Sequence, residues 1–90
     1  MFSSSHPTVF VVDDEHIIAS SLAAILRLHG YYATAFTSPR DALAAAQSRT
    51  LDLLIADVVM PGLSGVDLAI QVKAQHPECR ILLFSGQNAG

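Results

Sequence analysis

Short apolar runs alternate along the whole chain with longer segments of helical periodicity. Four runs are rich in β-branched or other apolar residues and predict strands at 8–12, 31–36, 51–57 and 80–84. Five of the six residues 51–56 are apolar, which is typical of a strand buried on both faces. A proline and a glycine soon after this run predict a loop. The third run is therefore predicted to be a central strand that carries a carboxylate to the edge of a sheet.

The three intervening segments carry helix signals. The segment 15–29 has apolar residues at helical spacing and is followed by a glycine, which is common just after a helix. The residues at this spacing are Ile18, Leu22, Ile25, Leu26 and His29. A second helix is predicted over 38–47, because Ser38 and Pro39 suit its N-cap and first turn and alanines follow. A third helix is predicted over 65–76, and Pro77 stops it because a proline cannot continue a helix.

Strict alternation of strand and helix predicts an α/β domain, a doubly wound parallel sheet with right-handed crossovers. In such a sheet the carboxyl ends of all strands meet at one edge, where ligands bind. Asp13 and Asp14 follow the first strand, Asp57 ends the third, and Ser85 follows the fourth. If the first, third and fourth strands are neighbours, these four side chains surround one crevice.

Composition narrows the function classes. The net charge is −3 and no basic stripe occurs, so binding of nucleic acid by this segment is not expected. The apolar runs are far too short for a membrane span. Residues 1–7 lack the pattern of a secretion signal, so we expect a disordered lead-in there and one domain over 8–90. The single cysteine, Cys79, has no partner for an internal disulfide, which fits the cytoplasm.

The acidic strand ends favour phosphoryl chemistry. Clustered carboxylates repel one another, so such a cluster has raised pKa values or holds a cation. Hard oxygen ligands suit Mg²⁺, which shares its remaining positions with water and phosphate. Asp57 is then a candidate nucleophile toward a phosphoryl group, and Ser85 a candidate hydrogen-bond donor to it. Structural roles are the alternative to this chemistry: Asp14 is then a helix cap, and Ser85 is then a turn residue.

The residues around these positions resemble the receiver domain of two-component response regulators. The motifs are VVDDE at 11–15, DVVMPGLSG at 57–65 and LFSG at 83–86. They occur in the family's order and spacing over nearly the whole chain. The resemblance implies a flavodoxin-like fold, here with strand order 2-1-3-4, and a role as a phosphoacceptor in signal transduction rather than as an enzyme.

The resemblance also implies roles for individual residues. Asp57 matches the phosphoacceptor, which takes a phosphoryl group from a histidine kinase or a phosphotransfer protein. Asp14 and Asp57 match direct ligands of Mg²⁺, together with the backbone carbonyl of Val59, and Asp13 matches an acidic residue that acts mainly through water. Ser85 matches the switch hydroxyl, which moves toward the phosphoryl group.

Three further matches are structural: Met60, Pro61 and Gly65 shape the loop after the acceptor. We expect Met60 to pack and Gly65 to permit a backbone turn. Receivers normally continue through a fourth helix, a fifth strand and a fifth helix, so the resemblance predicts a receiver truncated after strand four. The missing strand would carry a lysine that pairs with the phosphate. Lys73 is expected on a helix surface and Arg80 at the opposite edge of the sheet, so neither supplies that charge.

A sheet that ends at the fourth strand leaves an exposed edge. Apolar faces and unpaired backbone groups on residues 81–84 then invite pairing with another chain. We therefore expect a homo-oligomer, at least a dimer, formed through strand four or its exposed faces.

Two other functions compete with the phosphoacceptor. One is an inert, receiver-like interaction or oligomerisation domain that does not switch because the lysine is missing. The other is a Mg²⁺-dependent phosphatase with an aspartyl nucleophile. That enzyme class would place an acid–base aspartate two residues after Asp57, and Val59 occupies that position. The sequence therefore argues against the phosphatase.

Overall fold

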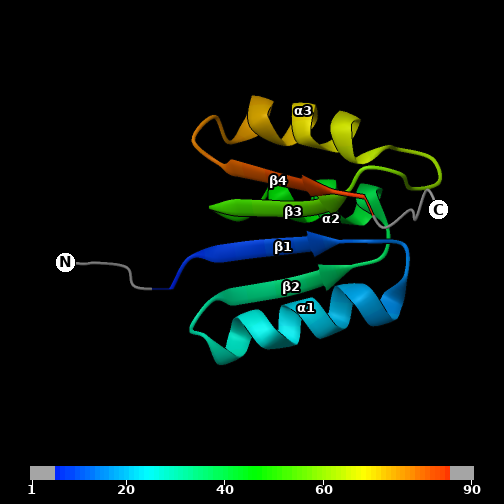
Figure 1. The fold of residues 1–90 in the computed structure, drawn as a ribbon. Coiled ribbons are helices and arrows are strands. Elements are labelled where there is room, and N and C mark those ends of the chain that lie inside the picture. Colours follow the sequence, from blue (N-terminus) through cyan, green and yellow to red (C-terminus); the bar gives the residue numbers. More distant parts are fainter. Residues whose placement is uncertain (1–5, 86–90) are drawn as a thin grey trace.

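The computed structural model describes residues 6–85 and contains the predicted alternation of strands and helices (Figure 1). The elements are β1 (Thr8–Val12), α1 (His16–Leu28), β2 (Tyr32–Phe36), α2 (Pro39–Ala46), β3 (Leu53–Asp57), α3 (Gly65–Gln75) and β4 (Arg80–Phe84). β1 and β4 have the predicted bounds, and the other elements are slightly shorter than predicted. Most of the predicted lead-in lies outside the described residues and stays a prediction. None of the described helices is long and apolar enough to cross a bilayer.

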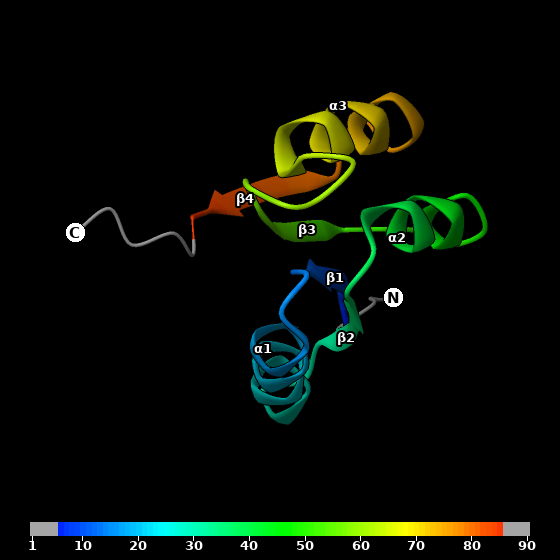
Figure 2. The same cartoon turned by 90° about the vertical axis from the view of Figure 1, so that its right-hand side faces the viewer.

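All four strands are parallel and lie in the predicted order, β2-β1-β3-β4. Val12 at the end of β1 is paired with Phe36 of β2 and with Ala56 of β3. Asp57 at the end of β3 is paired with Phe84 of β4. The carboxyl ends of the strands therefore meet at one edge of the sheet, which faces the viewer in Figure 2. α1 covers one face of the sheet, and α2 and α3 cover the other.

Serine side chains cap two of the helices, and the Ser38 cap was predicted from the sequence. Ser38 Oγ accepts a hydrogen bond from the Asp41 N–H at 3.3 Å, and Ser64 Oγ accepts one from the Asp67 N–H at 3.1 Å. An N-cap of this kind contributes about 1 kcal/mol. After α1, Gly30 adopts a φ of +91°, a conformation that side chains rarely tolerate. These residues mark the starts of α2 and α3 and the end of α1.

α1 differs from the prediction in its cap and in its buried face. Glu15 is the N-cap residue, so the alternative that Asp14 caps this helix is wrong. The helix buries Ala19 and Ala23 against the sheet, whereas Ile25 of the predicted apolar set is 53% exposed. Small side chains let the helix backbone approach the strands closely, and the larger side chains then lie at the margins of the contact.

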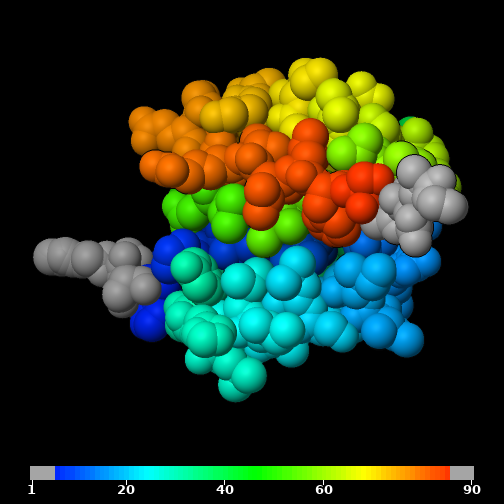
Figure 3. Space-filling model, in the orientation of Figure 1, coloured from blue at the N-terminus to red at the C-terminus, as the bar shows by residue number. Residues whose placement is uncertain are grey.

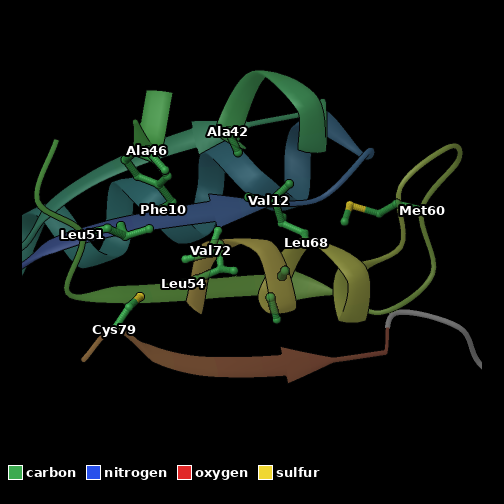
Figure 4. Packing of buried hydrophobic residues seen from close by; sticks show 12 residues of the cluster. Phe10, Val12, Ala42, Ala46, Leu51, Leu54, Met60, Leu68, Val72 and Cys79 are labelled. Atoms are coloured by element: carbon green, nitrogen blue, oxygen red, sulfur yellow. The ribbon is translucent and has the colours of Figure 1, made fainter. Parts of the chain in front are cut away.

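The larger core cluster fills the space between the sheet and the helices α2 and α3 (Figure 4). Phe10, Leu54 and Leu68 are fully buried there. Complete burial of such a side chain contributes roughly 2 kcal/mol. A smaller cluster between the sheet and α1 contains Val9 and Val11. The central strands are thus buried on both faces, as the apolar runs predicted.

β4 lies at one edge of the sheet and is more exposed than its neighbour β3 (Figure 3). Leu82 is 55% exposed, and the other apolar residues of β4 are partly buried. At the opposite edge, Arg27 Nη1 donates a hydrogen bond to the Ala33 carbonyl of β2 at 2.7 Å. A side chain of α1 therefore satisfies a backbone group of β2.

Candidate functional site

Asp57 ends β3 at the carboxyl edge of the sheet and is only 5% exposed. Its Oδ1 accepts a hydrogen bond from the Val59 N–H at 3.1 Å. The next residue, Val58, donates its N–H to the Phe84 carbonyl at 2.8 Å. The acceptor candidate is therefore held both by its own loop and by the end of the neighbouring strand.

Asp13 and Asp14 lie beside Asp57, as predicted. The Asp13 N–H donates to the Phe36 carbonyl at 3.1 Å, and its Oδ1 accepts from the Glu15 N–H at 2.9 Å. Asp13 is fully buried, whereas Asp14 is exposed. Each of the three aspartates offers an oxygen, and these three oxygens lie within 4.8 Å of one another.

The electrostatics of this cluster fit a bound cation. Burial raises the pKa of the Asp13 carboxyl, the hydrogen bond from the Glu15 backbone opposes the shift, and the charges of Asp57 and Asp14 raise the pKa further. Asp13 Oδ2 is buried and has no hydrogen-bond partner among the described residues. A buried, unsatisfied carboxylate oxygen is costly, and a cation would satisfy it. An all-oxygen donor set of this size suits Mg²⁺.

A hollow of about 420 Å³ opens above the cluster. Its lining comes from the loops after β1 and β3 and from the start of α1: Asp14, Glu15, Ile18, Asp57, Val59, Met60 and Pro61. The sequence predicted that Val59 belongs to the site, and this residue lines the hollow with its N–H bonded to Asp57. Glu15 and Ile18 were missed, since their place in a helical pattern gave no sign that the first turn of α1 borders the site.

Ser85 follows the residue of β4 that is paired with Asp57, so it leaves the sheet at the same edge. It is exposed. The other predicted charges lie elsewhere. Lys73 Nζ donates to the Pro77 carbonyl at 2.9 Å, near the end of α3. Arg80 begins β4, and its N–H donates to the Asp52 carbonyl at the opposite edge of the sheet.

The loop after Asp57 is shaped by one buried residue and one close contact. Met60 is 6% exposed and belongs to the larger core cluster, which confirms that it packs. Gly65 was expected to permit a turn, but positive φ angles occur at Gly30 and Gly62 among the described glycines. Gly65 is needed for space instead, since a Cβ atom there would overlap the carbonyl oxygen of Asp57.

Comparison with known families settles which proteins share this arrangement. The model of the response regulator receiver domain matches residues 9–90. The chain belongs to this family. Its receiver fold carries the acidic cluster at the carboxyl ends of β1 and β3, as the resemblance implied.

Similar receivers are found among regulators and solved structures. The probable transcriptional regulatory protein TcrX of Mycobacterium tuberculosis is 33% identical over 91% of this chain and 35% of its own length. The chemotaxis protein CheY4 of Vibrio cholerae has a TM-score of 0.85 at 29% identity, covering 94% of this chain and 72% of that one. The regulator TrrA of Thermotoga maritima, solved with Mg²⁺ and BeF, has a TM-score of 0.81 at 30% identity, covering 91% and 71%. The chain thus spans about a third of the length of TcrX.

Proposed function

We propose that Asp57 accepts a phosphoryl group from a phosphohistidine of a histidine kinase or a phosphotransfer protein. The observation that carries this proposal is a carboxylate 5% exposed that borders a hollow, with oxygens of Asp13 and Asp14 within 4.8 Å. Two findings on relatives support it. TrrA has also been solved in complex with the histidine kinase ThkA. A response regulator protein of Burkholderia pseudomallei has been solved with a phosphorylated aspartic acid, a calcium ion and citrate.

In the proposed transfer, an oxygen of Asp57 attacks phosphorus. The new O–P bond forms as the N–P bond of the donor breaks, and the bonding electron pair returns to the imidazole nitrogen. The Val59 N–H on Oδ1 fixes the orientation of the carboxylate for this attack. The side chains of Ile18 and Pro61 form the apolar part of the hollow that would receive the phosphoryl group.

We assign the Mg²⁺ ligands to Asp14, Asp57 and the backbone carbonyl of Val59, with Asp13 acting through water. The buried, unsatisfied Asp13 Oδ2 and the oxygen donor set support this assignment. A bound Mg²⁺ supplies positive charge for the phosphoryl oxygens. Ser85 is proposed to donate its hydroxyl proton in a hydrogen bond to a phosphoryl oxygen, since it leaves the sheet at the same edge as Asp57.

The experiment that tests the transfer is simple. The chain is incubated with Mg²⁺ and acetyl phosphate, and its intact mass is measured. We expect the addition of one phosphoryl group, which Asp57→Asn abolishes. Binding of Mg²⁺ without any phosphoryl addition would instead support an inert interaction domain.

We further propose that the chain acts in the cytoplasm as a phosphoacceptor rather than as an enzyme, and that it binds neither nucleic acid nor membrane. We also propose that β4 is the edge through which two copies associate. An antiparallel pair centred on Leu82 would cover this 55% exposed side chain and place Arg80 opposite Phe84 of the second copy. Sedimentation that shows a compact monomer at high concentration would refute this association.

A further inference from the structure

The acidic hollow carries one more carboxylate than the transfer requires. Glu15 lines the hollow together with Asp14 and Asp57. Its N–H is bonded to Asp13 Oδ1, so its backbone is tied to the cluster. Its side chain makes no capping hydrogen bond to α1, and among the described residues it takes part in no ion pair. The negative charge of Glu15 is therefore not neutralised locally.

The charge around the hollow is one-sided. Of the described residues that line it, three are acidic and none is basic. Beneath them lies the buried Asp13, whose Oδ2 has no partner among the described residues and so marks a place for a cation. The side chains of Arg27, Arg49 and Lys73 donate hydrogen bonds elsewhere, to Ala33, Thr34 and Pro77. The side chains that line the hollow thus offer an entering anion negative charge and no positive charge.

We propose that Glu15 sets the cation dependence of this site, strengthening the binding of Mg²⁺ and repelling small anionic phosphodonors. The inference rests on the proposed phosphoacceptor function. Glu15 acts through space, without being a ligand, because an exposed carboxylate at the rim attracts a divalent cation across water. The same charge repels a doubly charged small donor such as acetyl phosphate. A protein donor instead contacts the rim with its own surface, so its binding does not depend on the charge of the phosphoryl group alone.

This proposal predicts two opposite effects of one substitution. Glu15→Gln should raise the Kd for Mg²⁺ roughly two- to fivefold at low ionic strength, the scale expected for one charge acting on a divalent ion several ångströms away. At Mg²⁺ concentrations that saturate each variant, it should lower the KM for acetyl phosphate by a similar factor. Structural damage at the site would instead weaken both interactions. Both effects should shrink as salt is added, because the charge is exposed.

The experiment measures the Kd for Mg²⁺ by calorimetry and the KM for acetyl phosphate from initial rates of mass addition. Glu78→Gln, which removes an equal charge at the opposite edge of the sheet, is the matched control, and Glu15→Asp should restore both wild-type values. An equal Kd for Mg²⁺ in the Glu15→Gln and Glu78→Gln variants overturns the proposal. A weaker Kd without a lower KM overturns its second half. If the wild type gains no phosphoryl group, the proposed function fails, while the calorimetry still tests Glu15.

Discussion

Gly65 offers the sharpest test of how the loop after Asp57 is built. A Cβ atom at this position would overlap the carbonyl oxygen of Asp57 and lie 2.8 Å from the carbonyl carbon. Both atoms belong to the main chain, so no side-chain rotation relieves the clash. Either β3 or the start of α3 must shift, which also strains the hydrogen bond from the Gly65 N–H to the Val58 carbonyl at 3.0 Å.

The magnitude for Gly65→Ala follows from these contacts. Overpacking costs about 1–3 kcal/mol, and a strained hydrogen bond adds about 1 kcal/mol. The better helix propensity of alanine returns at most about 1 kcal/mol. We therefore expect the free energy of unfolding to fall by about 2 kcal/mol, measured by urea titration followed by circular dichroism. Because Asp57 would move together with its carbonyl group, its carboxylate would be displaced, and Mg²⁺ binding should also weaken.

Gly62→Ala is the matched control in the same loop. Gly62 has a φ of +82°, but a Cβ atom there meets nothing within 4 Å. The substitution should cost only about 1 kcal/mol, from backbone strain alone. If Gly65→Ala costs no more than Gly62→Ala, the close approach of α3 to Asp57 is not what requires glycine, and the reasoning is refuted.

Two further predictions concern the core and the acidic cluster. Leu54→Ala, in the larger core cluster, should lower the free energy of unfolding by about 2–5 kcal/mol. Leu82→Ala, at the exposed edge of the sheet, should cost less than about 1 kcal/mol. Equal losses in urea titrations of the two variants would contradict the difference in burial between Leu54 and Leu82. Burial raises the native pKa of Asp13, so its ionised form destabilises the fold: the penalty is absent below the ordinary pKa of 3.8 and complete above the raised pKa. Without Mg²⁺, Asp13→Asn should therefore raise the free energy of unfolding at neutral pH by about 1–2 kcal/mol, with the gain disappearing in acid; a loss of stability at neutral pH would show that Asp13 is not the penalised group.

Much of the fold could be predicted because local signals and topology agree. The bounds of β1 and β4 and the Ser38 cap followed from apolar runs and capping chemistry, and the strand order followed from the resemblance to receiver domains. The buried face of α1 could not be predicted. Helical spacing favours large apolar residues as the buried ones, whereas close packing against the sheet requires small residues, here Ala19 and Ala23. Helix and strand lengths were overestimated by a residue or two where the pattern of apolar and polar residues continues beyond the regular hydrogen bonds of the element.

The site was predictable where it lies on strand ends and less so where it depends on loops. Parallel topology, with the strand order that the resemblance implied, predicted that Asp13, Asp14 and Asp57 lie together. The spatial role of Gly65 was not visible, since a glycine that avoids a clash and one that turns the chain look the same in sequence. Glu15 was missed for a similar reason, because its place at the hollow depends on how α1 leaves the sheet.

The central claim is that Asp57 is the phosphoacceptor, and intact-mass spectrometry of matched variants tests it most directly. The wild type, Asp57→Asn and Asp41→Asn are each incubated with acetyl phosphate, with Mg²⁺ or with a chelator. Asp41 lies in the exposed first turn of α2 and has no part in the cluster. We predict that one phosphoryl group is added to the wild type and to Asp41→Asn with Mg²⁺, and to neither with the chelator. Phosphoryl addition to Asp57→Asn equal to that of the wild type would contradict the account.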